Sequence, residues 1–377
     1  MTAEKPTSSN YSPGLEGVIA GETAISTVET GLTYRGYAIE DLAANSTYEE
    51  VAYLILYGEL PTAAQAAAFR QRLGAAAAVP QEIIETLRRI PHAAPSMDVL
   101  RSAVSLLAHW EKEMGDNSHA ANLRKTERLL AQAPVIVAAR QRLMTGQEPV
   151  AADPSLTLPA NFLWMLRGQK PSPKQVEALD VSLILYAEHE FNASTFSARC
   201  VVSTLSDLHS GITGAIGALK GPLHGGANEA ALKVLQEVGS PDRAEAWVRG
   251  ALARKQKIMG FGHRVYKDGD PRAVYLKRLT AAVAAETGQH DMEKMAEIIE
   301  SIVWSEKKIP PNVDWPCARL YHYFGLPADL FTPLFVVARI VGWSAHIIEQ
   351  LDNNRIVRPR SIYKGPSVRK WKPVEQR

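Results

Sequence analysis

The distribution of apolar residues predicts helices along most of the chain. Apolar positions recur at three- and four-residue spacing in one segment after another, with Pro, Gly or Asn between the segments. Alanine, the best helix former, is abundant throughout. We expect helices at residues 39–44, 48–58, 63–77, 81–89, 97–110, 122–146, 227–238, 241–258, 272–287, 291–306, 317–324 and 332–350. The Pro-rich stretches 147–160 and 168–173 are expected to be connectors, and the predicted fold class is all-α.

Two segments depart from this simple helical pattern. Residues 17–37 are rich in Thr, Val and Ile between glycines, which predicts a small N-terminal β hairpin. Residues 174–210 contain neither Gly nor Pro, and this run is too long for a typical globular helix. Because Asn192 starts a helix-cap signal in the middle of the run, we expect two helices that meet near residues 190–194. His189 and Asn192 then lie at a helix junction.

Three glycines, Gly211, Gly214 and Gly217, place small residues on one helix face. Such a face lets two helices approach closely. Close approach across a subunit interface and tight packing within one chain explain the spacing equally well.

Composition excludes several classes of partner. The chain has 377 residues, of which 46% are hydrophobic and 22% charged, and its formal net charge is +2. A charge this close to neutral argues against nucleic acid or a membrane surface as the main partner. Cys200 and Cys317 form no CxxC motif or disulfide framework, and the polar N-terminus lacks the apolar core of a signal peptide. We therefore expect a cytoplasmic protein.

The most apolar late stretch, residues 334–348, is interrupted by Arg339 and His346. These polar residues favour a buried helix of a soluble protein over a membrane span. An arginine in a buried helix needs an anionic partner. For Arg339 alone, a structural salt bridge and a bound anionic substrate are equally good explanations.

Three expected loops each carry a titratable group next to Gly or Pro: His224, His263 and Asp314. Loops between rigid helices commonly carry catalytic groups. His224 sits in a Gly-rich turn before the helix at 227–238, where outward backbone N–H groups and the helix dipole favour a neutral imidazole. For this turn alone, a histidine that merely caps or packs remains the alternative.

Other chemistries find no support in the motifs. The chain has no GxSxG, which argues against a hydrolase nucleophile, and no GxxxxGK[ST] for a nucleotide phosphate. Its only G-x-G, at Gly260 and Gly262, has Val265 where a dinucleotide fingerprint needs a third glycine. The loop histidines lack the spacing of helical metal ligands, and nearby arginines repel cations, so no metal site is expected.

Four motifs in the order Lys220–Asn228, Met259–Arg272, Pro311–Asp314 and Asp352–Lys364 resemble the citrate synthase family. The resemblance extends from about Gly14 to the C-terminus. The stretches at 22–43, 186–199 and 370–377 are most similar to bacterial members of the 2-methylcitrate and bifunctional branch.

This resemblance implies a two-domain helical homodimer that joins an acyl-CoA to oxaloacetate and then hydrolyses the thioester. Residues 1–223 and 324–377 would form a large, dimer-forming domain, and residues 224–323 a small domain on the CoA side of a cleft that closes on substrate. Neither a metal nor a cofactor is implied, because the coenzyme A thioester is itself a substrate.

The resemblance also assigns roles to individual residues. His224 matches the histidine that hydrogen-bonds the thioester oxygen as the enol forms, Asp314 the base that removes the α-proton, and His263 the histidine that polarises the oxaloacetate ketone. The implied oxaloacetate-binding residues are His189, Asn192, Arg272, Arg339 and, from the other subunit, Arg358. The implied CoA-binding residues are Lys257, Ile258, Met259, Gly260, Phe261, Gly262, Lys267 and Asn312.

Some features leave alternatives open. Pro316 and Cys317 follow the matched base where many relatives carry other residues, so acetyl-CoA use is expected with propionyl-CoA, or both, as the alternative. An inactive helical scaffold is the alternative from another class. The tail 355–377 holds eight Lys or Arg and one Glu, and its Trp371 and prolines favour an extended arm on the partner subunit over a solvated or nucleic-acid-binding tail.

Overall fold

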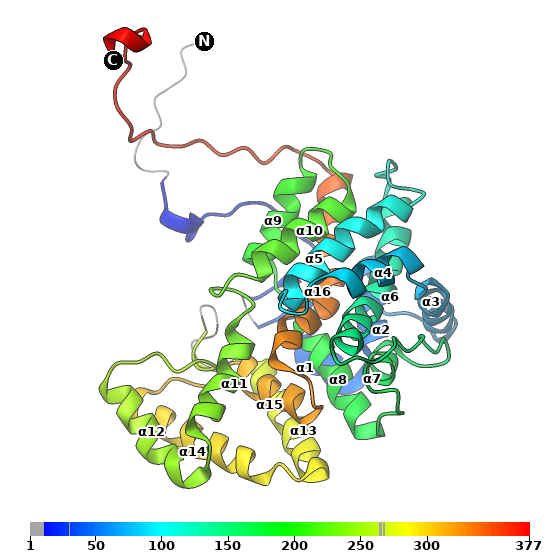
Figure 1. The fold of residues 1–377 in the computed structure, drawn as a ribbon, viewed down its shortest axis with the longest axis vertical. Coiled ribbons are helices and arrows are strands. Elements are labelled where there is room, and N and C mark those ends of the chain that lie inside the picture. The colour runs from blue at the N-terminus through cyan, green and yellow to red at the C-terminus, as the bar shows by residue number, and fades with distance from the viewer. Residues whose placement is uncertain (1–10, 30, 264–265, 267) are drawn as a thin grey trace.

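The computed structural model describes residues 11–29, 31–263, 266 and 268–377, and confirms the all-α fold class (Figure 1). The α-helices are α1 (Ile39–Asn45), α2 (Tyr48–Tyr57), α3 (Ala63–Ala76), α4 (Gln81–Arg89), α5 (Ser96–Leu107), α6 (His119–Met144), α7 (Leu158–Arg167), α8 (Pro173–Tyr186), α9 (Ala193–Val202), α10 (Leu208–Leu219), α11 (Ala227–Val238), α12 (Pro241–Ala253), α13 (Pro271–Thr287), α14 (His290–Lys307), α15 (Asp314–Tyr323) and α16 (Phe331–Asp352). Many of them begin at a capping residue: for α2, Thr47 accepts from the Glu50 backbone while the Glu50 side chain accepts from Thr47.

Helix α16 forms the centre of the core. It contacts α2, α5, α6, α8, α9 and α10, which surround it in Figure 1. The apolar window within residues 328–352 is long enough to cross a membrane but is 100% buried inside the protein. The expectation of a buried helix at 334–348 is therefore confirmed, and the core side chains of other helices take the place of lipid.

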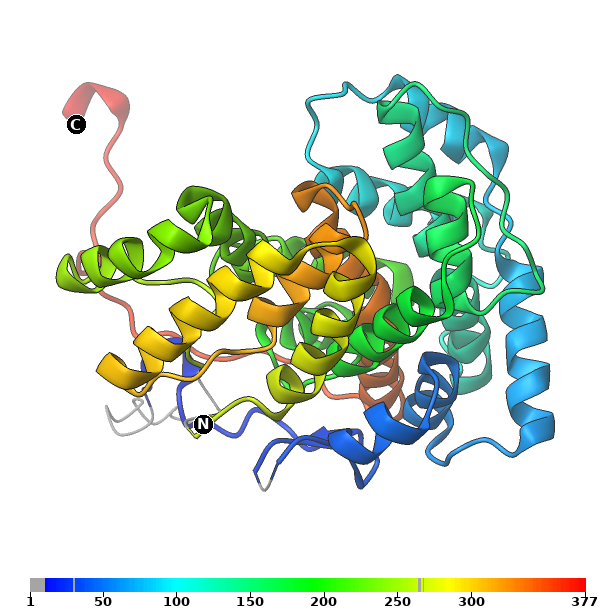
Figure 2. The same ribbon diagram turned by 90° about the horizontal axis from the view of Figure 1, so that it is seen from below.

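Helices α11 to α15 gather at the lower left of Figure 1, and Figure 2 shows them on one side of the molecule from a second direction. They pack mainly on one another, through α12 with α14 and through α15 with both α11 and α13. Helix α13 also contacts α1 and α8 of the larger group. These five helices fall within residues 224–323, the span predicted for the small domain.

The β element differs from the predicted hairpin. It is a three-stranded antiparallel sheet in the order β1 (Ser26–Thr27), β2 (Thr33–Tyr34), β3 (Tyr37–Ala38). Arg35 and Gly36 form the tight turn between β2 and β3, with φ of 49° and 87°. Two consecutive residues of positive φ are what a two-residue hairpin turn requires. The Arg35-Gly36 pair thus divides the second half of the predicted hairpin into two strands, β2 and β3.

Residues 194–210 were expected to form one helix, and this expectation was wrong. Helix α9 ends at Val202 and α10 begins at Leu208, with Asp207 accepting a hydrogen bond from the Ser210 backbone as its cap. Between them, the Ser203 and Thr204 hydroxyls donate to carbonyls of the preceding turn. Such local side-chain bonds compete with helix propagation. The absence of Gly and Pro concealed this break.

Helix α7 was missed because its proline was interpreted as part of a connector. Pro159 lies in the first turn of α7, where proline is well tolerated because its missing N–H has no helical partner. Gly168 ends the helix in the left-handed conformation, with φ of 70°. The pair marks the two ends of a helix that the sequence pattern alone had left as a linker.

The glycines of α10 pack tightly within the chain. A Cβ on Gly211 would lie 2.8 Å from both Ile347 and Val202, and one on Gly214 would lie 3.2 Å from Val201. A side chain at Gly211 would therefore push α10 away from α9 and α16. Intrachain packing accounts for these two positions, and the role of the face in a subunit interface stays a prediction.

Candidate active site

The predicted site residues lie on elements that meet between the two groups of helices. These elements are the junction of α8 and α9, the turn before α11, the loops that precede α13 and α15, and α16. The contacts described below link many of these elements, whereas Arg358 lies on the C-terminal tail and Lys267 lies outside the described residues.

His224 is held on its turn by the backbone. The backbone N–H of His224 donates to the Gly221 carbonyl at 2.9 Å. The next residue must be glycine, because a Cβ on Gly225 would lie only 2.5 Å from the Leu219 carbonyl oxygen. The His224 Nε2 lies 2.8 Å from the Ser194 Oγ and accepts from the Ser194 backbone N–H at 3.3 Å. Because an N–H can only donate, Nε2 is the acceptor and a neutral imidazole carries its proton on Nδ1.

Burial lowers the pKa of His224 to about 4, and the positive charge of Arg339 acts in the same direction. The imidazole is therefore neutral at neutral pH. The sequence predicted this state, but for another reason, since it invoked the helix dipole. The structure attributes the shift to desolvation and to an arginine that is distant in sequence.

Asp314 is the first residue of α15, and its Oδ1 accepts a hydrogen bond of 2.7 Å from the Tyr186 hydroxyl. Burial raises the pKa of the Asp314 carboxyl, while the Tyr186 hydrogen bond and the charge of Arg272 oppose this rise. Opposing influences of this kind are typical of a carboxylate that exchanges protons during a reaction.

Asn312 connects Asp314 to the loop that precedes α13. Its backbone N–H donates to the Gly260 carbonyl and its Nδ2 to the Gly262 carbonyl, both at 2.9 Å. Its Oδ1 accepts from the Asp314 backbone N–H at 3.1 Å. Gly260 has a φ of 90°, and a Cβ there would lie 2.7 Å from Trp315. Hydrogen bonds thus hold the two loops against each other, and Asn312 supplies several of them.

The remaining residues predicted to contact CoA differ in their surroundings. Ile258 and Phe261 are buried, Met259 is half-buried and Lys257 is exposed. Lys267 lies outside the described residues. The burial of Ile258 and Phe261 fixes this loop against the core, and CoA binding by the loop stays a prediction.

Two imidazoles and a tyrosine form a second cluster. The rings of His189 and His263 lie 5.5 Å apart, and Tyr266 stacks on His263 at 4.7 Å. The Tyr266 hydroxyl lies 3.1 Å from His189 Nε2. Burial, Arg272 and Arg339 hold the pKa of His189 well below its usual range, so this imidazole is also neutral.

Arg272 is 4% exposed and forms a two-pronged ion pair with Asp270, with Nε–Oδ1 and Nη2–Oδ2 distances of 2.9 Å. Asp270 also accepts from the Val313 backbone N–H at 3.0 Å. It therefore holds the loop of Asp314 as well as the guanidinium. The sequence analysis missed Asp270 as a site residue, although its position before Pro271 marks a helix start.

Arg339 is 2% exposed, and its Nε donates to the Tyr186 carbonyl at 2.6 Å. No ion pair joins it to a carboxylate within the described part of the chain. Glu188 carries the charge that acts most on it, but Glu188 is bound by Ser26 and His346. The structural salt bridge considered for Arg339 is thus not formed, and an anionic ligand remains the better explanation.

Two predicted oxaloacetate residues have other surroundings. The Oδ1 of Asn192 caps α9 by accepting from Thr195 at 3.1 Å, and its Nδ2 donates to the His189 carbonyl at 3.3 Å. This amide is engaged in shaping the helix junction. Arg358 lies exposed on the C-terminal tail, and the described residues of its own chain provide no hydrogen bond or ion pair for it.

Tyr186 and Ser194 are the main residues that the sequence analysis missed. Both lie within the quoted stretch 186–199, but nothing in that pattern shows where their hydroxyls point. Ser194 also accepts a hydrogen bond from Trp343 Nε1 at 3.1 Å, which ties His224 to α16. Only the tertiary contacts reveal these roles.

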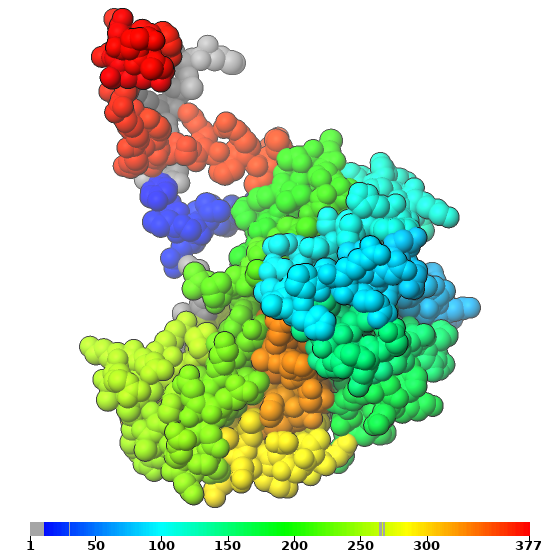
Figure 3. All heavy atoms as spheres, viewed as in Figure 1, coloured from blue at the N-terminus to red at the C-terminus, as the bar shows by residue number. Residues whose placement is uncertain are grey.

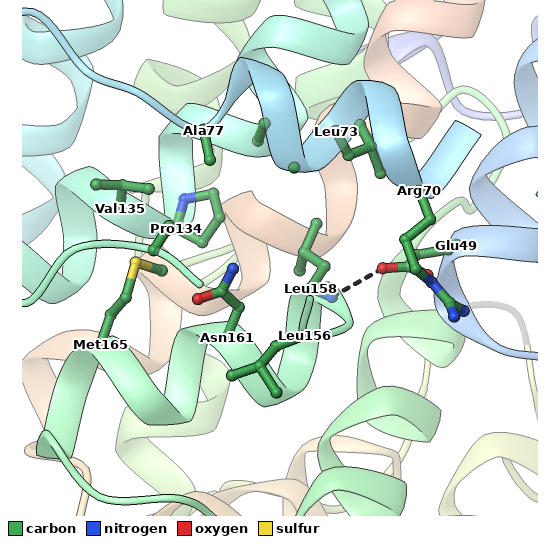
Figure 4. Close-up of a pocket in the computed structure, with 13 residues that line it drawn as sticks. Glu49, Arg70, Leu73, Ala77, Pro134, Val135, Leu156, Leu158, Asn161 and Met165 are labelled. Atoms are coloured by element: carbon green, nitrogen blue, oxygen red, sulfur yellow. Dashed lines mark hydrogen bonds and ion pairs between the residues drawn. The ribbon is translucent and has the colours of Figure 1, made fainter. Parts of the chain in front are cut away.

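A separate cavity lies among α2, α3, α6 and α7 (Figure 4). Its volume is about 30 Å³, enough for one or two waters. Glu49 on its wall pairs with Arg70 at 2.6 Å and accepts from the Leu158 backbone at 2.9 Å. The cavity is too small for a coenzyme and shares no residue with the cluster described above. A group of His, Cys, Asp or Glu suited to a metal is also absent from the described residues.

Sequence comparison identifies close relatives over nearly the whole chain. Residues 14–360 match the family model "Citrate synthase, C-terminal domain". "Citrate synthase 2" of Bacillus subtilis is 50% identical over 367 residues, which span 97% of this chain and 98% of the relative. "2-methylcitrate synthase" of Shewanella oneidensis is 48% identical over 370 residues, which span 97% of each chain.

Solved structures agree with the sequence matches. Citrate synthase from Pyrobaculum aerophilum has a TM-score of 0.90 at 40% identity, covering 97% of this chain and 95% of that one. Citrate synthase from Thermoplasma acidophilum, in a ternary complex with carboxymethyl coenzyme A and oxaloacetate, has a TM-score of 0.91 at 33% identity, covering 97% and 99%. The chain belongs to the citrate synthase family and is a transferase that condenses an acyl-CoA with oxaloacetate.

Proposed function

We propose that acetyl-CoA is the main acyl donor of this enzyme, which then makes citrate and CoA from acetyl-CoA, oxaloacetate and water in the tricarboxylic acid cycle. The observation that carries the proposal is the convergence of Asp314, neutral His224 and the buried Arg339 through direct contacts with Tyr186 and Ser194. An inactive scaffold has no need for a buried arginine without a carboxylate partner next to a hydrogen-bonded base.

Oxaloacetate binds between Arg272, Arg339 and the imidazoles of His189 and His263. Its two planar carboxylates suit guanidinium groups, which donate parallel hydrogen bonds. Both arginines are buried beside the neutral His189, and Arg339 forms no ion pair with a carboxylate among the described residues, whereas Arg272 is paired with Asp270. The related Thermoplasma enzyme was solved with oxaloacetate and a CoA analogue, which supports the same pairing of ligands here.

The carbon nucleophile forms at the acyl group. The Asp314 carboxylate removes a proton from the α-carbon, a transfer that contributes about 100- to 10,000-fold to the rate. The Nδ1–H of His224 donates to the thioester oxygen as the negative charge develops there, and loss of such a donor lowers the rate by about 100- to 1000-fold. Ser194 fixes the required tautomer, because it occupies Nε2.

The enol carbon then attacks the oxaloacetate ketone. A carbon–carbon bond forms, the ketone π electrons move to its oxygen, and His263, which hydrogen-bonds that oxygen, passes it a proton to give the hydroxyl. His263 regains a proton from solvent, and Asp314 releases the proton that it removed from the α-carbon, so the protons balance. Water subsequently attacks the thioester carbonyl, and the carbon–sulfur bond breaks to release CoA as its thiol. Closure of the small domain over the large one would exclude water until the carbon–carbon bond has formed, which prevents loss of acyl-CoA.

Propionyl-CoA is the alternative acyl donor, with 2-methylcitrate as the product. The relatives named for the two reactions are almost equally similar, at 50% and 48% identity. Pro316 and the buried Cys317 follow the base on α15, so they lie close to the acyl group. One methyl group in such a pocket changes binding by about 1–3 kcal/mol, so use of both donors is physically easy.

Release of CoA thiol from acetyl-CoA and propionyl-CoA, each with and without oxaloacetate, tests this proposal. We expect oxaloacetate-dependent release with a higher kcat/KM for acetyl-CoA. Comparable or higher propionyl-CoA activity would move the enzyme to the 2-methylcitrate branch. No release with either donor would support the inactive scaffold.

We further propose a cytoplasmic homodimer in which Arg358 of each chain completes the site of the other. The tail beyond α16 is extended and exposed, and it projects away from the helices in Figures 1 and 3. Tyr363 and Trp371 on it are 75% and 78% exposed. Large apolar side chains on an extended arm favour a protein partner over solvent. Both cysteines are free, in keeping with a reducing compartment.

Subunit complementation tests the dimer proposal. Co-expressed Arg358→Ala and Asp314→Ala chains, each inactive alone, would form mixed dimers with one intact and one doubly defective site. Random pairing should then restore about a quarter of the wild-type activity, because half of the dimers are mixed and half of their sites are intact. Absence of recovery in isolated mixed dimers would place Arg358 outside the partner's site.

A further inference from the structure

Tyr186 has no role in the proposed reaction, yet it contacts several residues that do. It is the last residue of α8 and is 2% exposed. Its hydroxyl donates to Asp314 Oδ1 at 2.7 Å, and its backbone carbonyl accepts from Arg339 Nε at 2.6 Å. One residue thus connects the expected base with the expected oxaloacetate arginine.

The tyrosine ring is fixed from two sides. It packs against Phe335 of α16 with ring centroids 4.4 Å apart. The Arg339 guanidinium lies over the Phe335 ring, with its Cζ 4.8 Å from the ring centroid. On the opposite group of helices, Asn228 of α11 donates to the Tyr186 hydroxyl at 3.5 Å. A ring held in this way leaves its hydroxyl few alternative positions.

The hydrogen bond has a defined direction. Burial and the neighbouring Asp314 raise the pKa of Tyr186 well above its usual value, so the phenol stays protonated. Its O–H therefore donates the hydrogen bond, and the Asp314 carboxylate accepts it. Cys317, one turn further along α15, interacts with the same phenol and with Asn228, and burial raises its thiol pKa to about 12. The groups around Asp314 on this side are therefore neutral.

We propose that Tyr186 is a positioning residue for proton removal, whose hydroxyl occupies Oδ1 of Asp314 and thereby directs Oδ2 toward the acyl α-carbon. This inference rests on the proposed role of Asp314 as the base. A carboxylate bound at one oxygen loses rotational freedom, and the same bond favours its ionised form over its protonated form. Tyr186 acts on the chemistry through Asp314 and touches neither substrate.

A purely structural role is the competing explanation, because Tyr186 also packs in the core. Tyr321 provides a matched control in the same core. It is fully buried on α15, and its hydroxyl lies 3.2 Å from the Ser182 Oγ and also interacts with the Cys317 thiol. Removing that hydroxyl deletes a buried polar group of the same kind without deleting a hydrogen bond to the base.

The experiment compares Tyr186→Phe and Tyr321→Phe in the full-length enzyme with saturating oxaloacetate. For Tyr186→Phe we expect kcat to fall by about 10- to 150-fold, the range for loss of one hydrogen bond to a charged group, with the KM for oxaloacetate nearly unchanged. The acid limb of the kcat profile should move to higher pH, because the carboxyl loses a bond that favours its ionised form. Tyr321→Phe should keep both the rate and the profile.

An isotope effect isolates the proton-removal step. With acetyl-CoA deuterated at the methyl group, the primary effect on kcat/KM should be larger in Tyr186→Phe than in the wild type, since proton removal becomes more rate-limiting. Equal rate losses in both variants, or a loss in Tyr186→Phe without changes in the pH profile and isotope effect, would overturn the positioning role. Unchanged kcat in Tyr186→Phe would do so as well.

Asp314→Asn separates this inference from the function on which it depends. This variant keeps the shape of the side chain but removes its basicity, so its turnover should be lost. If Asp314→Asn retained turnover, the assignment of the base itself would fail. If it is inactive while Tyr186→Phe behaves as the wild type, only the positioning role fails.

Discussion

The two halves of the site are built differently. On one side, His189 and Arg339 belong to the buried junction of α8 and α9 and to α16, the centre of the core. On the other side, His224, His263 and Asp314 lie on or beside loops of the smaller group of helices, and a few hydrogen bonds fix them. Core packing fixes the helical half, which carries the proposed oxaloacetate contacts His189 and Arg339. Specific hydrogen bonds fix the loop half, which carries the proposed base Asp314, the proposed thioester histidine His224 and His263, the proposed contact to the oxaloacetate ketone.

Because of this difference, we expect oxaloacetate binding and catalytic turnover to respond separately to substitution. The helical half supplies charge that is already in place before any substrate arrives, because Arg339 is held by α16 and by the Tyr186 carbonyl. The loop half depends on Asn312 and Asp270, each of which bridges two segments. Substitution of Arg339 should weaken oxaloacetate binding, and substitution of Asp314 or Asn312 should slow turnover or weaken acyl-CoA binding.

The largest effect is expected at the base. Asp314→Ala should lower kcat by about 100- to 10,000-fold, because it removes the proposed general base. Oxaloacetate binding, measured by calorimetry without acyl-CoA, should remain largely intact. Near-normal turnover would show that another residue is the base, and a parallel loss of oxaloacetate affinity would show that the two halves are not separable.

A smaller effect, of the opposite kind, is expected in the helical half. Arg339→Ala should weaken oxaloacetate binding by about 10- to 150-fold, the range for loss of hydrogen bonds to a charged group. Calorimetry gives the affinity, and Arg339→Lys is the control that keeps the charge but loses the planar fork. Unchanged affinity in Arg339→Ala would return Arg339 to a structural role.

The helical half was the easier one to predict from the sequence. An arginine within the apolar stretch 334–348 is conspicuous, because burial of an unpaired charge is unfavourable and requires a reason. The helix pattern and the cap signal at Asn192 also located the junction that carries His189. Glycine and proline around His224, His263 and Asp314 marked the loops. These signals are local, and a single sequence displays them.

The contacts that organise the site could not be predicted, because they join residues distant in the chain. Tyr186 and Asp314 are 128 positions apart, and Ser194 and His224 are 30 apart. The sequence shows that a tyrosine precedes His189, but not that its hydroxyl reaches α15. The roles of the matched residues came from family resemblance, and the structure adds the second set of residues that holds them in place.

Asn312 tests the link within the loop half, with a smaller expected effect. Asn312→Ala removes the bonds to the Gly262 carbonyl and to the Asp314 backbone. Each neutral hydrogen bond contributes about 0.5–1.5 kcal/mol, so the KM for acetyl-CoA should rise and kcat fall by about 2- to 10-fold each, with oxaloacetate affinity unchanged. Steady-state kinetics measures both, and Asn45→Ala, at the exposed end of α1, is the control. An effect on oxaloacetate alone would contradict the link.

The smallest expected effect concerns the protonation state of His224, because this imidazole should not titrate near neutral pH. Burial and Arg339 lower its pKa to about 4, so between pH 8 and pH 5 the imidazole should stay neutral and keep its proton on Nδ1. The ring resonances of His224, assigned with a His224→Gln variant, should not shift over this range in an NMR titration. A midpoint near 6.5, the value of a free imidazole, would mean that an imidazolium faces the thioester. Arg339→Ala sharpens the test, because it removes a positive charge that lowers the pKa of His224. The pKa of His224 should therefore rise in this variant. A titration that begins at higher pH would show that the charge of Arg339, in the helical half, controls the protonation of His224, in the loop half.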